Sequence, residues 1–249
     1  MYGAVSLSPL NMDIALIGYG KMGKAIEAVA LERGHRIPLI IDVDNLDAFT
    51  RENLQKVQAV IEFTGPLTAF DNVMRCLEFD VPVVSGSTGW YVRLNTAKEL
   101  CAARNGSMLC TSNFSLGVNL FFELNRSLAH LMGNFPAYKA TITETHHTQK
   151  LDKPSGTAIT LAEGVIDEIP DVKSWELDGA GQGVLPVYAF RENDVPGTHI
   201  VKYASDIDDI EIIHTAHSRQ GFALGAVLAA EYIHNKKGVF SMKSLINSK

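Results

Sequence analysis

The first part of the chain alternates short apolar runs with helical patterns. One helical pattern covers residues 21–34, where Met22, Ile26, Val29 and Ala30 form one stripe and Gly34 supplies a stop. Short apolar runs that alternate with helices are typical of a parallel sheet covered on both faces. The predicted strands are 13–18, 36–42, 57–66, 81–89 and 107–113, and further helices are predicted at 67–79 and about 91–104.

The pattern changes at residue 116. Residues 116–132 form an amphipathic helical pattern, and Phe121, Leu124, Leu128 and Leu131 are predicted to share its apolar stripe. Runs that follow one another without helices indicate a second, α+β domain with a mixed, mostly antiparallel sheet and helices on one face. The predicted elements are strands at 138–145, 183–190, 198–205 and 209–217, and a helix at about 157–168.

The two ends of the chain are predicted to differ in structure. The apolar, Ala-rich segment 221–235 and the segment 238–246 are expected to return to the first domain. Residues 1–11 have neither a basic region nor a long apolar core, so a signal peptide is not expected. We expect a disordered extension, a tag remnant or an over-called start site.

Composition excludes several classes of partner. The 249 residues are 46% apolar, and the formal net charge is −6. No long Lys or Arg run indicates nucleic acid binding, and no stretch of about 18 apolar residues predicts a membrane span. Cys76, Cys101 and Cys110 lack C-x-x-C spacing and are expected to be buried free thiols of a cytoplasmic protein.

A glycine-rich loop joins the first predicted strand to the first helix. It reads GYGKMG, with Gly18, Gly20 and Gly23 in G-x-G-x-x-G spacing. A bare match would also suit a tight turn without ligand, but here the motif leaves a strand and opens a helix. In that context the glycines permit the turn, the approach of a pyrophosphate and close helix–strand packing. The predicted cofactor-binding residues of this loop are Gly18, Tyr19, Gly20, Lys21, Met22 and Gly23.

Asp42 bears on the choice of cofactor. It ends the next predicted strand, nineteen residues after Gly23, where a carboxylate accepts hydrogen bonds from an adenosine ribose. The same carboxylate repels a 2′-phosphate, so we expect NADH to be preferred over NADPH. Lys21 is the residue that could reach a 2′-phosphate instead.

Three further loops follow apolar strands, at 63–66, 86–89 and 111–114. Ligands of open parallel sheets bind outside the carboxyl ends of the strands. Each loop alone would suit a simple turn. Together with the glycine-rich loop, however, there are four such loops in succession, which favours a cofactor groove.

The stretch ETHHTQKLDKPSGTA, residues 144–158, concentrates candidate chemistry. His146 and His147 end a predicted strand and should point in opposite directions, which argues against a shared metal ion. Ser155 is a plausible helix N-cap that leaves amides near Gly156 and Thr157 for an anion, and Lys150 and Lys153 flank it. A capped helix beside a solvated loop explains the composition equally well.

This stretch resembles the signature of the dihydrodipicolinate reductase family, also called 4-hydroxy-tetrahydrodipicolinate reductase, of the diaminopimelate route to lysine. Every fixed position of E-x-H-H-x-x-K-x-D-x-P-S-G-T-A is met. SNFSLGVN (112–119) and HTAHSRQGFALGA (214–226) resemble further family motifs, and the likeness extends from about residue 13 to the end. GSTG (86–89) resembles the family's G-T-T-G, with Ser87 for Thr, and RENDVPGTH (191–199) resembles its R-x-G-x-x-x-G-x-H, with Asn193 where Gly is usual.

The resemblance implies a Rossmann-type dinucleotide-binding domain around an inserted α+β domain. The first would comprise residues 1–113 and 219–249, and the second, 114–218, would bind substrate and build a homotetramer through its sheet. The partner would be a small dicarboxylate, with no nucleic acid and no membrane. The reaction would reduce 4-hydroxy-tetrahydrodipicolinate to tetrahydrodipicolinate with NADH or NADPH.

The resemblance also implies roles for individual residues. His146 would be the proton donor and acceptor, with Lys150 as the second donor. His147 would help neutralise a substrate carboxylate lying on Ser155, Gly156 and Thr157. The nicotinamide would lie by two loops, whose residues are Gly86, Ser87, Thr88, Thr111, Ser112, Asn113 and Phe114.

Two alternatives remain at this point. One is another two-domain NAD(P)-dependent dehydrogenase of amino-acid metabolism, such as an aspartate or homoserine dehydrogenase. The other is a non-catalytic NAD-binding sensor. The fifteen-residue match to the signature disfavours the first, and the intact set of His146, His147 and Lys150 disfavours the second.

Overall fold

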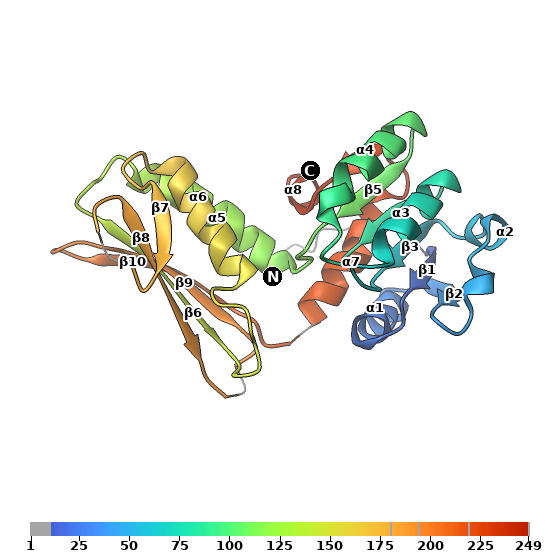
Figure 1. Ribbon diagram of the computed structural model, residues 1–249, viewed down its shortest axis with the longest axis horizontal. Helices are drawn as coiled ribbons and strands as arrows, with labels where there is room; N and C mark the ends of the chain where they lie inside the picture. The colour runs from blue at the N-terminus through green and yellow to red at the C-terminus, as the bar shows by residue number, and fades with distance from the viewer. Residues whose placement is uncertain (1–10, 180, 194, 219, 249) are drawn as a thin grey trace. The chain divides into compact units, whose positions relative to one another are not determined.

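The computed structural model describes residues 11–179, 181–193, 195–218 and 220–248 (Figure 1). The chain divides into two compact units, Met1–Leu116 with Arg219–Lys249, and Gly117–Ser218. The extension expected at residues 1–11 lies, apart from Asn11, outside the described residues.

The first unit contains a six-stranded, fully parallel sheet (Figure 1). Every predicted strand is present but shorter, because the predicted runs included the turn residues that follow each strand. In spatial order the strands are β11 (Gly238–Phe240), β5 (Ser107–Cys110), β4 (Val83–Ser85), β3 (Ala59–Glu62), β1 (Asp13–Ile17) and β2 (Arg36–Ile41).

Helices cover both faces of this sheet, as the pattern predicted. One core cluster joins the sheet to α3 (Ala69–Glu78) and α4 (Leu94–Ala103), which follows the 3-10 turn η2 (Tyr91–Arg93). The opposite cluster joins it to α1 (Lys21–Glu32) and α7 (Gln220–Ile233). Two short elements between β2 and β3 were not predicted, η1 (Leu46–Ala48) and α2 (Arg51–Leu54).

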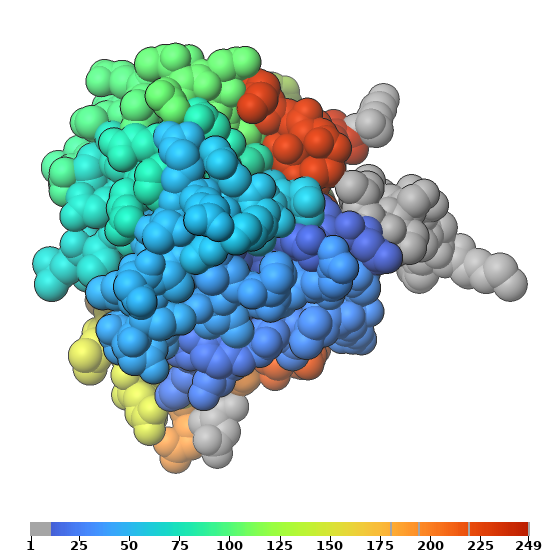
Figure 2. All heavy atoms as spheres, turned by 90° about the vertical axis from the view of Figure 1, so that its right-hand side faces the viewer, coloured from blue at the N-terminus to red at the C-terminus, as the bar shows by residue number. Residues whose placement is uncertain are grey.

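The C-terminal segment completes the first unit, which confirms the expectation for residues 221–246. β11 pairs with β5, and Met242 of α8 (Met242–Ile246) is buried in the same core cluster as α7. In Figure 2 this red segment lies on the surface beside the green segment around α4. The two ends of the chain therefore build one parallel sheet.

The second unit contains a five-stranded mixed sheet in the order β10-β9-β6-β8-β7. The β10–β9 and β9–β6 pairs are antiparallel, whereas β6–β8 and β8–β7 are parallel. The sheet is thus mixed, as predicted, but the expectation of a mostly antiparallel sheet was wrong, because two of its four pairings are parallel. One of these, β6–β8, is possible because a helix lies between the two strands along the chain. Its strands are β6 (Lys139–His146), β7 (Ser174–Leu177), β8 (Val184–Arg191), β9 (Thr198–Ala204) and β10 (Asp209–Thr215).

The sequence pattern missed β7. The strand has only four residues, none of them buried, and it lies at the edge of the sheet. A short exposed edge strand lacks the apolar alternation by which strands are found in a sequence.

Helices α5 (Leu116–Met132) and α6 (Gly156–Glu168) pack on one face of this sheet. The bounds of α5 agree with the prediction, but its apolar stripe was only half right, because Phe121 and Leu128 pack in the core and the other two residues do not. Leu124 and Leu131 are 52% and 61% exposed, whereas Val118, Asn125 and Met132 are buried. The buried amide of Asn125 donates to the Leu161 carbonyl of α6, so a polar residue occupies a core position that hydropathy assigns to solvent.

No helix in the described part of the chain combines the length and apolar character needed to cross a bilayer. The cysteines are free, as expected, although Cys110 is only partly buried while Cys76 and Cys101 are buried.

Candidate active site

The glycine-rich loop runs from β1 into α1, and its three glycines differ in surroundings. A Cβ at Gly18 would lie 2.3 Å from the Phe63 carbonyl oxygen, and one at Gly23 would lie 2.3 Å from the Gly18 carbonyl oxygen. Gly18 also has φ +90°, which favours glycine. Beside Gly20, apart from its chain neighbours and the backbone of its own helix, no atom of the described residues lies within 4 Å of such a Cβ. The protein itself therefore requires the first and third glycines, while the second faces open space.

The start of α1 is suited to an anion. Gly20 is its N-cap and provides no side-chain hydrogen bond to the first turn. The first amides of a helix lack intrahelical acceptors and carry the positive end of the helix dipole. The residues present therefore fit a pyrophosphate, held by amides that no capping side chain occupies.

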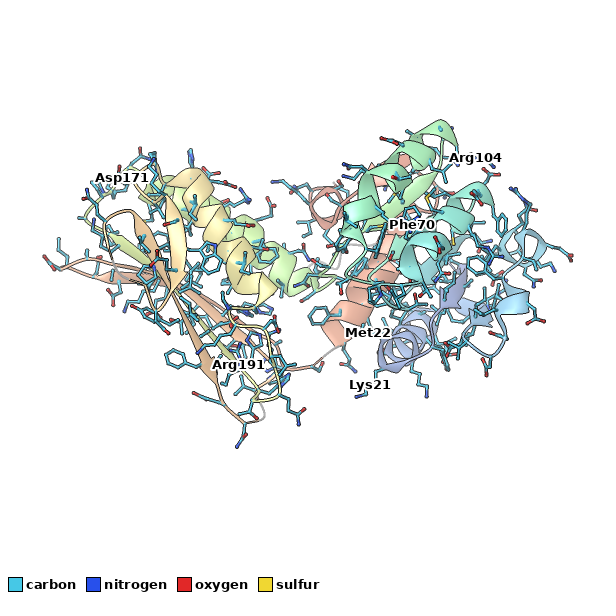
Figure 3. The ribbon with its side chains drawn as sticks, viewed as in Figure 1. Lys21, Met22, Phe70, Arg104, Asp171 and Arg191 are labelled. Atoms are coloured by element: carbon cyan, nitrogen blue, oxygen red, sulfur yellow. The ribbon has the colours of Figure 1, made fainter. Side chains whose placement is uncertain are left out.

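The other predicted residues of this loop have different roles. Tyr19 donates a short hydrogen bond to Glu27 of α1 and, like Met22, packs at the edge of the core. Lys21 is exposed at the first position of α1, and Figure 3 labels it beside Met22. Only Lys21 of these three presents a charge to solvent.

Asp42 lies directly after β2 in a turn. Its backbone amide donates to the Asn45 side chain at 2.7 Å, and its carbonyl accepts from the Asn45 amide at 3.2 Å. Across the described ranges, no side chain pairs with the Asp42 carboxylate. The carboxylate is therefore available to a ribose.

A buried carboxylate that sequence analysis missed joins the next two strand ends. Glu62, the last residue of β3, is 0% exposed. It accepts from the Thr64 amide at 2.8 Å, from the Ser87 hydroxyl at 2.9 Å and from the Ser85 hydroxyl. The Ser87 hydroxyl also accepts from the Thr64 amide. The predicted cofactor residue Ser87 thus uses its side chain to hold loops together, while Thr88 beside it is exposed.

The loop at 111–114 is also internally bonded. The Thr111 hydroxyl accepts from the Asn113 amide at 3.3 Å, and the Asn113 side chain accepts from the Ser115 amide at 2.9 Å. Phe114 is 2% exposed and packs on the Phe63 ring, with centroids 5.7 Å apart. The side chain of Phe114 therefore belongs to the core, whereas Ser112 is exposed.

In the second unit, the turn before α6 has the predicted form. Ser155 is the N-cap, and its hydroxyl accepts from the Ala158 amide at 3.2 Å. Gly156 is exposed, with no atom within 4 Å of a Cβ built on it, and Thr157 is half-buried. The helix thus begins with its small first residue facing open space.

The two histidines differ in surroundings. His146 is the last residue of β6 and only 7% exposed, while His147 is half-buried just beyond the strand. Lys150 pairs with Asp152 at 2.8 Å, and Lys153 is exposed. Lys153 and Pro154 are joined by a cis peptide bond.

Beside His146 lies a second completely buried glutamate, Glu144, which is 0% exposed. Its Oε2 lies 3.5 Å from Nδ1 of His146 and 3.6 Å from Nε2 of His199. Arg191, labelled in Figure 3 at the end of β8, donates to Oε1 at 3.2 Å. The His199 Nε2 also lies 3.2 Å from the Ser155 hydroxyl. The cluster therefore connects β6, β8 and β9 to the start of α6.

Two pKa shifts follow from this packing. Burial is the main cause that lowers the pKa of His146 to about 4, and the charge of His199 adds to it against the opposing effect of Glu144. For Glu144, burial opposes ionisation, but hydrogen bonds from His199 and Ser155 and the charge of His146 together lower its pKa to about 2. At neutral pH the ligand-free site therefore holds an ionised Glu144 beside a neutral His146.

The geometry of Glu144, His146 and His199 raises the question of a metal ion, because their ligand atoms lie within 4.8 Å of one another. The carboxylate, however, already accepts from the Ser155 amide and from Arg191. A guanidinium at this distance opposes a further cation. We therefore assign the cluster as a charge-balanced polar network and not as a metal site.

No role was predicted from the sequence for Glu144, Arg191 or His199. Glu144 lies in the 144–158 signature, and the other two are the first and last residues of the 191–199 motif, distant from the signature along the chain. The available signals were that motif and strand alternation, which places Glu144 and His146 on one face. Only the pairing of β6 with β8 and β9 brings the other two beside them.

Comparison with known proteins gives matches over both units. The family model described as "Dihydrodipicolinate reductase, N-terminus" matches residues 12–114, and "Dihydrodipicolinate reductase, C-terminus" matches residues 117–246. A Christiangramia forsetii protein named 4-hydroxy-tetrahydrodipicolinate reductase is 48% identical over 238 residues, covering 95% of this chain and 98% of that relative. A Neisseria meningitidis protein of the same name is 30% identical, covering 88% and 83%.

One solved structure is similar throughout. The dipicolinate-bound dihydrodipicolinate reductase from Paenisporosarcina sp. TG-14 matches with a TM-score of 0.75 at 21% identity, covering 93% of this chain and 98% of that one. The similarity shows a common fold.

Proposed function

The chain belongs to the dihydrodipicolinate reductase family, and from that premise we propose that it reduces 4-hydroxy-tetrahydrodipicolinate to tetrahydrodipicolinate. The observation that carries the proposal is the buried pair of Glu144 and His146 beside the N-capped turn at Ser155. A proton-transfer group and an anion-binding helix start lie together there, as reduction of a dicarboxylate requires. The two-domain dehydrogenase alternative is set aside, because the family models cover both units.

The cofactor is a pyridine nucleotide, and the Rossmann-type sheet of the first unit carries the residues that would bind it. The pyrophosphate would lie on the first amides of α1 beside Gly20, and Asp42 would accept from the ribose. The loops 86–88 and 111–114 would contact the nicotinamide. When bound, the reduced nicotinamide supplies the hydride.

NADH is the proposed preference. The unpaired Asp42 carboxylate repels a 2′-phosphate and so disfavours NADPH. Lys21, exposed in the glycine-rich loop, is the cation that could instead attract a 2′-phosphate. Steady-state kinetics with both cofactors measure this, and a higher kcat/KM with NADPH would contradict it. Asp42→Asn, which removes the charge at nearly constant shape, should narrow the difference, whereas Asp44→Asn is the matched control.

The substrate dianion would be held by the start of α6. One carboxylate would accept from the Gly156 and Thr157 amides and the Thr157 hydroxyl, with Ser155 holding the turn. His147 and Lys150 would balance its charge. The open space beside Gly156 supports close approach of a ligand to this backbone.

His146 is the proposed proton donor. In the reaction the 4-hydroxyl and a proton of C3 leave together as water, which creates a C3–C4 double bond. Hydride then adds at C4 and a proton adds at C3. Because neutral His146 is a weak acid, it has to gain a proton when the dianion binds, and an added negative charge raises a histidine pKa in that way. Lys150 is the second donor.

We also propose that the second unit assembles a homotetramer, with the enzyme working in the cytoplasm. Phe190 and Ile213 support the assembly, because they are 51% and 58% exposed. Their strand neighbours in register place both on the sheet face that α5 and α6 leave uncovered. Sedimentation of the parent and of an Ile213→Ser variant measures the assembly.

The decisive experiment is oxidation of NADH in the presence of enzymatically generated 4-hydroxy-tetrahydrodipicolinate. We expect tetrahydrodipicolinate to form in equal amount to the NADH consumed. NADH that binds without being consumed would instead support the alternative of a non-catalytic sensor.

A further inference from the structure

One carboxylate occupies the centre of the second unit's polar cluster. Both oxygens of Glu144 lie 3.1 Å from the Ser155 amide, which donates to them, and Arg191 donates to Oε1 through two nitrogens at 3.2 and 3.3 Å. Oε2 lies 3.5 Å from Nδ1 of His146 and 3.6 Å from Nε2 of His199. Among the described residues, this buried Nδ1 has no hydrogen-bond partner, and Oε2 is the acceptor beside it. The same side chain therefore contacts the residue that caps α6 and the proposed proton donor.

We propose that Glu144 is a positioning residue for the proton transfer, an inference that rests on the proposed function. It holds His146 as the tautomer with the proton on Nδ1, directed at Oε2, and it stabilises the imidazolium once a substrate binds. Nε2 on the opposite edge of the ring then carries the exchangeable proton. Glu144 does not touch the substrate itself, because its own oxygens are buried and already bonded.

The surroundings of Nε2 agree with this orientation. A Cβ at Gly197 would lie 3.0 Å from Nε2 and 3.1 Å from Cδ2 of His146. The glycine, whose φ is +156°, thus leaves space on the edge of the ring that faces away from Glu144. A side chain there would push against the donor atom.

The charges around His146 explain why a carboxylate is needed. His199 packs edge-on against the ring at 4.9 Å, and together with Lys150 and Arg191 it opposes a positive charge on His146. Glu144 is the group that favours that charge. Without its carboxylate, the imidazolium would face three cationic or potentially cationic side chains.

The Glu144→Gln variant separates the contact of Glu144 with the Ser155 amide from its contact with His146. Glutamine keeps an oxygen that can accept from the Ser155 amide, and Arg191 remains held by the Lys150, Asp152 and Phe190 carbonyl oxygens. The substrate turn should persist while the charge beside His146 is lost. Binding of pyridine-2,6-dicarboxylate should therefore stay close to that of the parent.

The first test is the pH profile of kcat in the full-length enzyme. The descending alkaline limb, where the donor loses its proton, should move to lower pH in Glu144→Gln by roughly 1–3 units, the usual effect of a neighbouring charge. Glu144→Asp, which keeps the charge, should restore much of the shift. Glu163→Gln, an exposed carboxylate on α6, is the matched control. A limb at the parent's pH in Glu144→Gln would overturn the proposal.

The second test does not depend on activity or on a Glu144 variant that folds. Nitrogen NMR of the histidine rings, with His146→Gln to assign the signal, reports the tautomer in the ligand-free parent. We expect His146 to be neutral with its proton on Nδ1, and a proton on Nε2 would overturn the proposal. If NADH is not oxidised but the Nδ1 tautomer is observed, the proposed function fails while the positioning by Glu144 stands. Loss of the parent's activity on chelation and recovery with Zn²⁺ would instead make the cluster a metal site and overturn it.

Discussion

Glu62 and Glu144 are both completely buried, one at a strand end of each unit, yet their partners differ in kind. Glu62 accepts from an amide, two serine hydroxyls and the Thr64 hydroxyl, which are all neutral. Glu144 accepts from an amide and an arginine and faces two histidines. The same residue type at the same burial therefore holds loops in place in one unit and controls a titrating side chain in the other.

The largest expected effect comes from removing the titrating partner of Glu144. In His146→Gln, kcat should fall about 10²–10⁴-fold, the usual value of general acid–base catalysis. The substrate KM should change much less, because the lost interaction forms in the transition state. Steady-state kinetics measure both.

NADH affinity should be unchanged in this variant, since the cofactor is assigned to the other unit. His130→Gln, an exposed histidine of α5, provides the control. A kcat near that of the parent would transfer the donor role to Lys150 or to water.

The next effect concerns the turn that Glu144 supports. Thr157→Val keeps the side-chain shape and removes the hydroxyl, and a lost hydrogen bond to a charged group costs about 1.5–3 kcal/mol, or roughly 10- to 100-fold in affinity. Pyridine-2,6-dicarboxylate should bind more weakly by that factor in a calorimetric titration, while NADH affinity stays constant. Thr160→Val, one turn further along α6, is the matched control. Equal affinity in Thr157→Val and the parent would reduce the turn to a helix cap.

The Glu62→Gln variant tests the glutamate whose hydrogen-bond partners are neutral. It removes the charge from a set of hydrogen bonds, which should lower the free energy of unfolding by roughly 1–3 kcal/mol. The KM for NADH should rise, because the carboxylate joins two loops assigned to the cofactor. Denaturant unfolding and kinetics measure these quantities, with exposed Glu99→Gln as control.

The kcat pH profile distinguishes the two glutamates. It should keep the parent's limbs in Glu62→Gln, whose partners are neutral, and shift in Glu144→Gln. A shifted alkaline limb in Glu62→Gln would remove the distinction drawn between the two buried carboxylates.

The smallest effect is the loss of folding stability at acid pH that arises from His146 and Glu144. The pKa of His146 is lowered from 6.5 to about 4, so below pH 6.5 the unfolded chain binds a proton that the folded chain does not. Stability should therefore fall as the pH drops from 6.5 to about 4. The pKa of Glu144 is lowered from 4.5 to about 2, so its contribution is present above pH 4.5 and lost on further acidification.

Free energies of unfolding measured between pH 8 and pH 4 test this, because this range includes both the unfolded and the folded pKa of His146. His146→Gln should show a shallower decline than the parent between pH 6.5 and pH 4. Identical slopes would mean that the histidine is not buried in its neutral form.

The sequence by itself determined the alternation of strands and helices, the glycine-rich loop, the Ser155 cap and the return of residues 221–246 to the first unit. Each of these features depends on residues close together along the chain: the spacing of apolar residues, the backbone freedom of glycine, or the length of an apolar run. The 144–158 signature likewise identified the family, since its chemistry lies in one continuous stretch.

Tertiary structure alone decided which face of α5 is buried, that β7 joins the sheet, and which groups surround each buried glutamate. Asn125 enters the core because Leu161 offers it a carbonyl, and His199 reaches Glu144 because β9 pairs with β6. The Ser87 hydroxyl donates to Glu62 for the same reason, a contact that the sequence did not predict, while its cofactor contact stays a prediction. These contacts join residues distant along the chain, and their energies depend on burial and partner geometry that no local pattern contains.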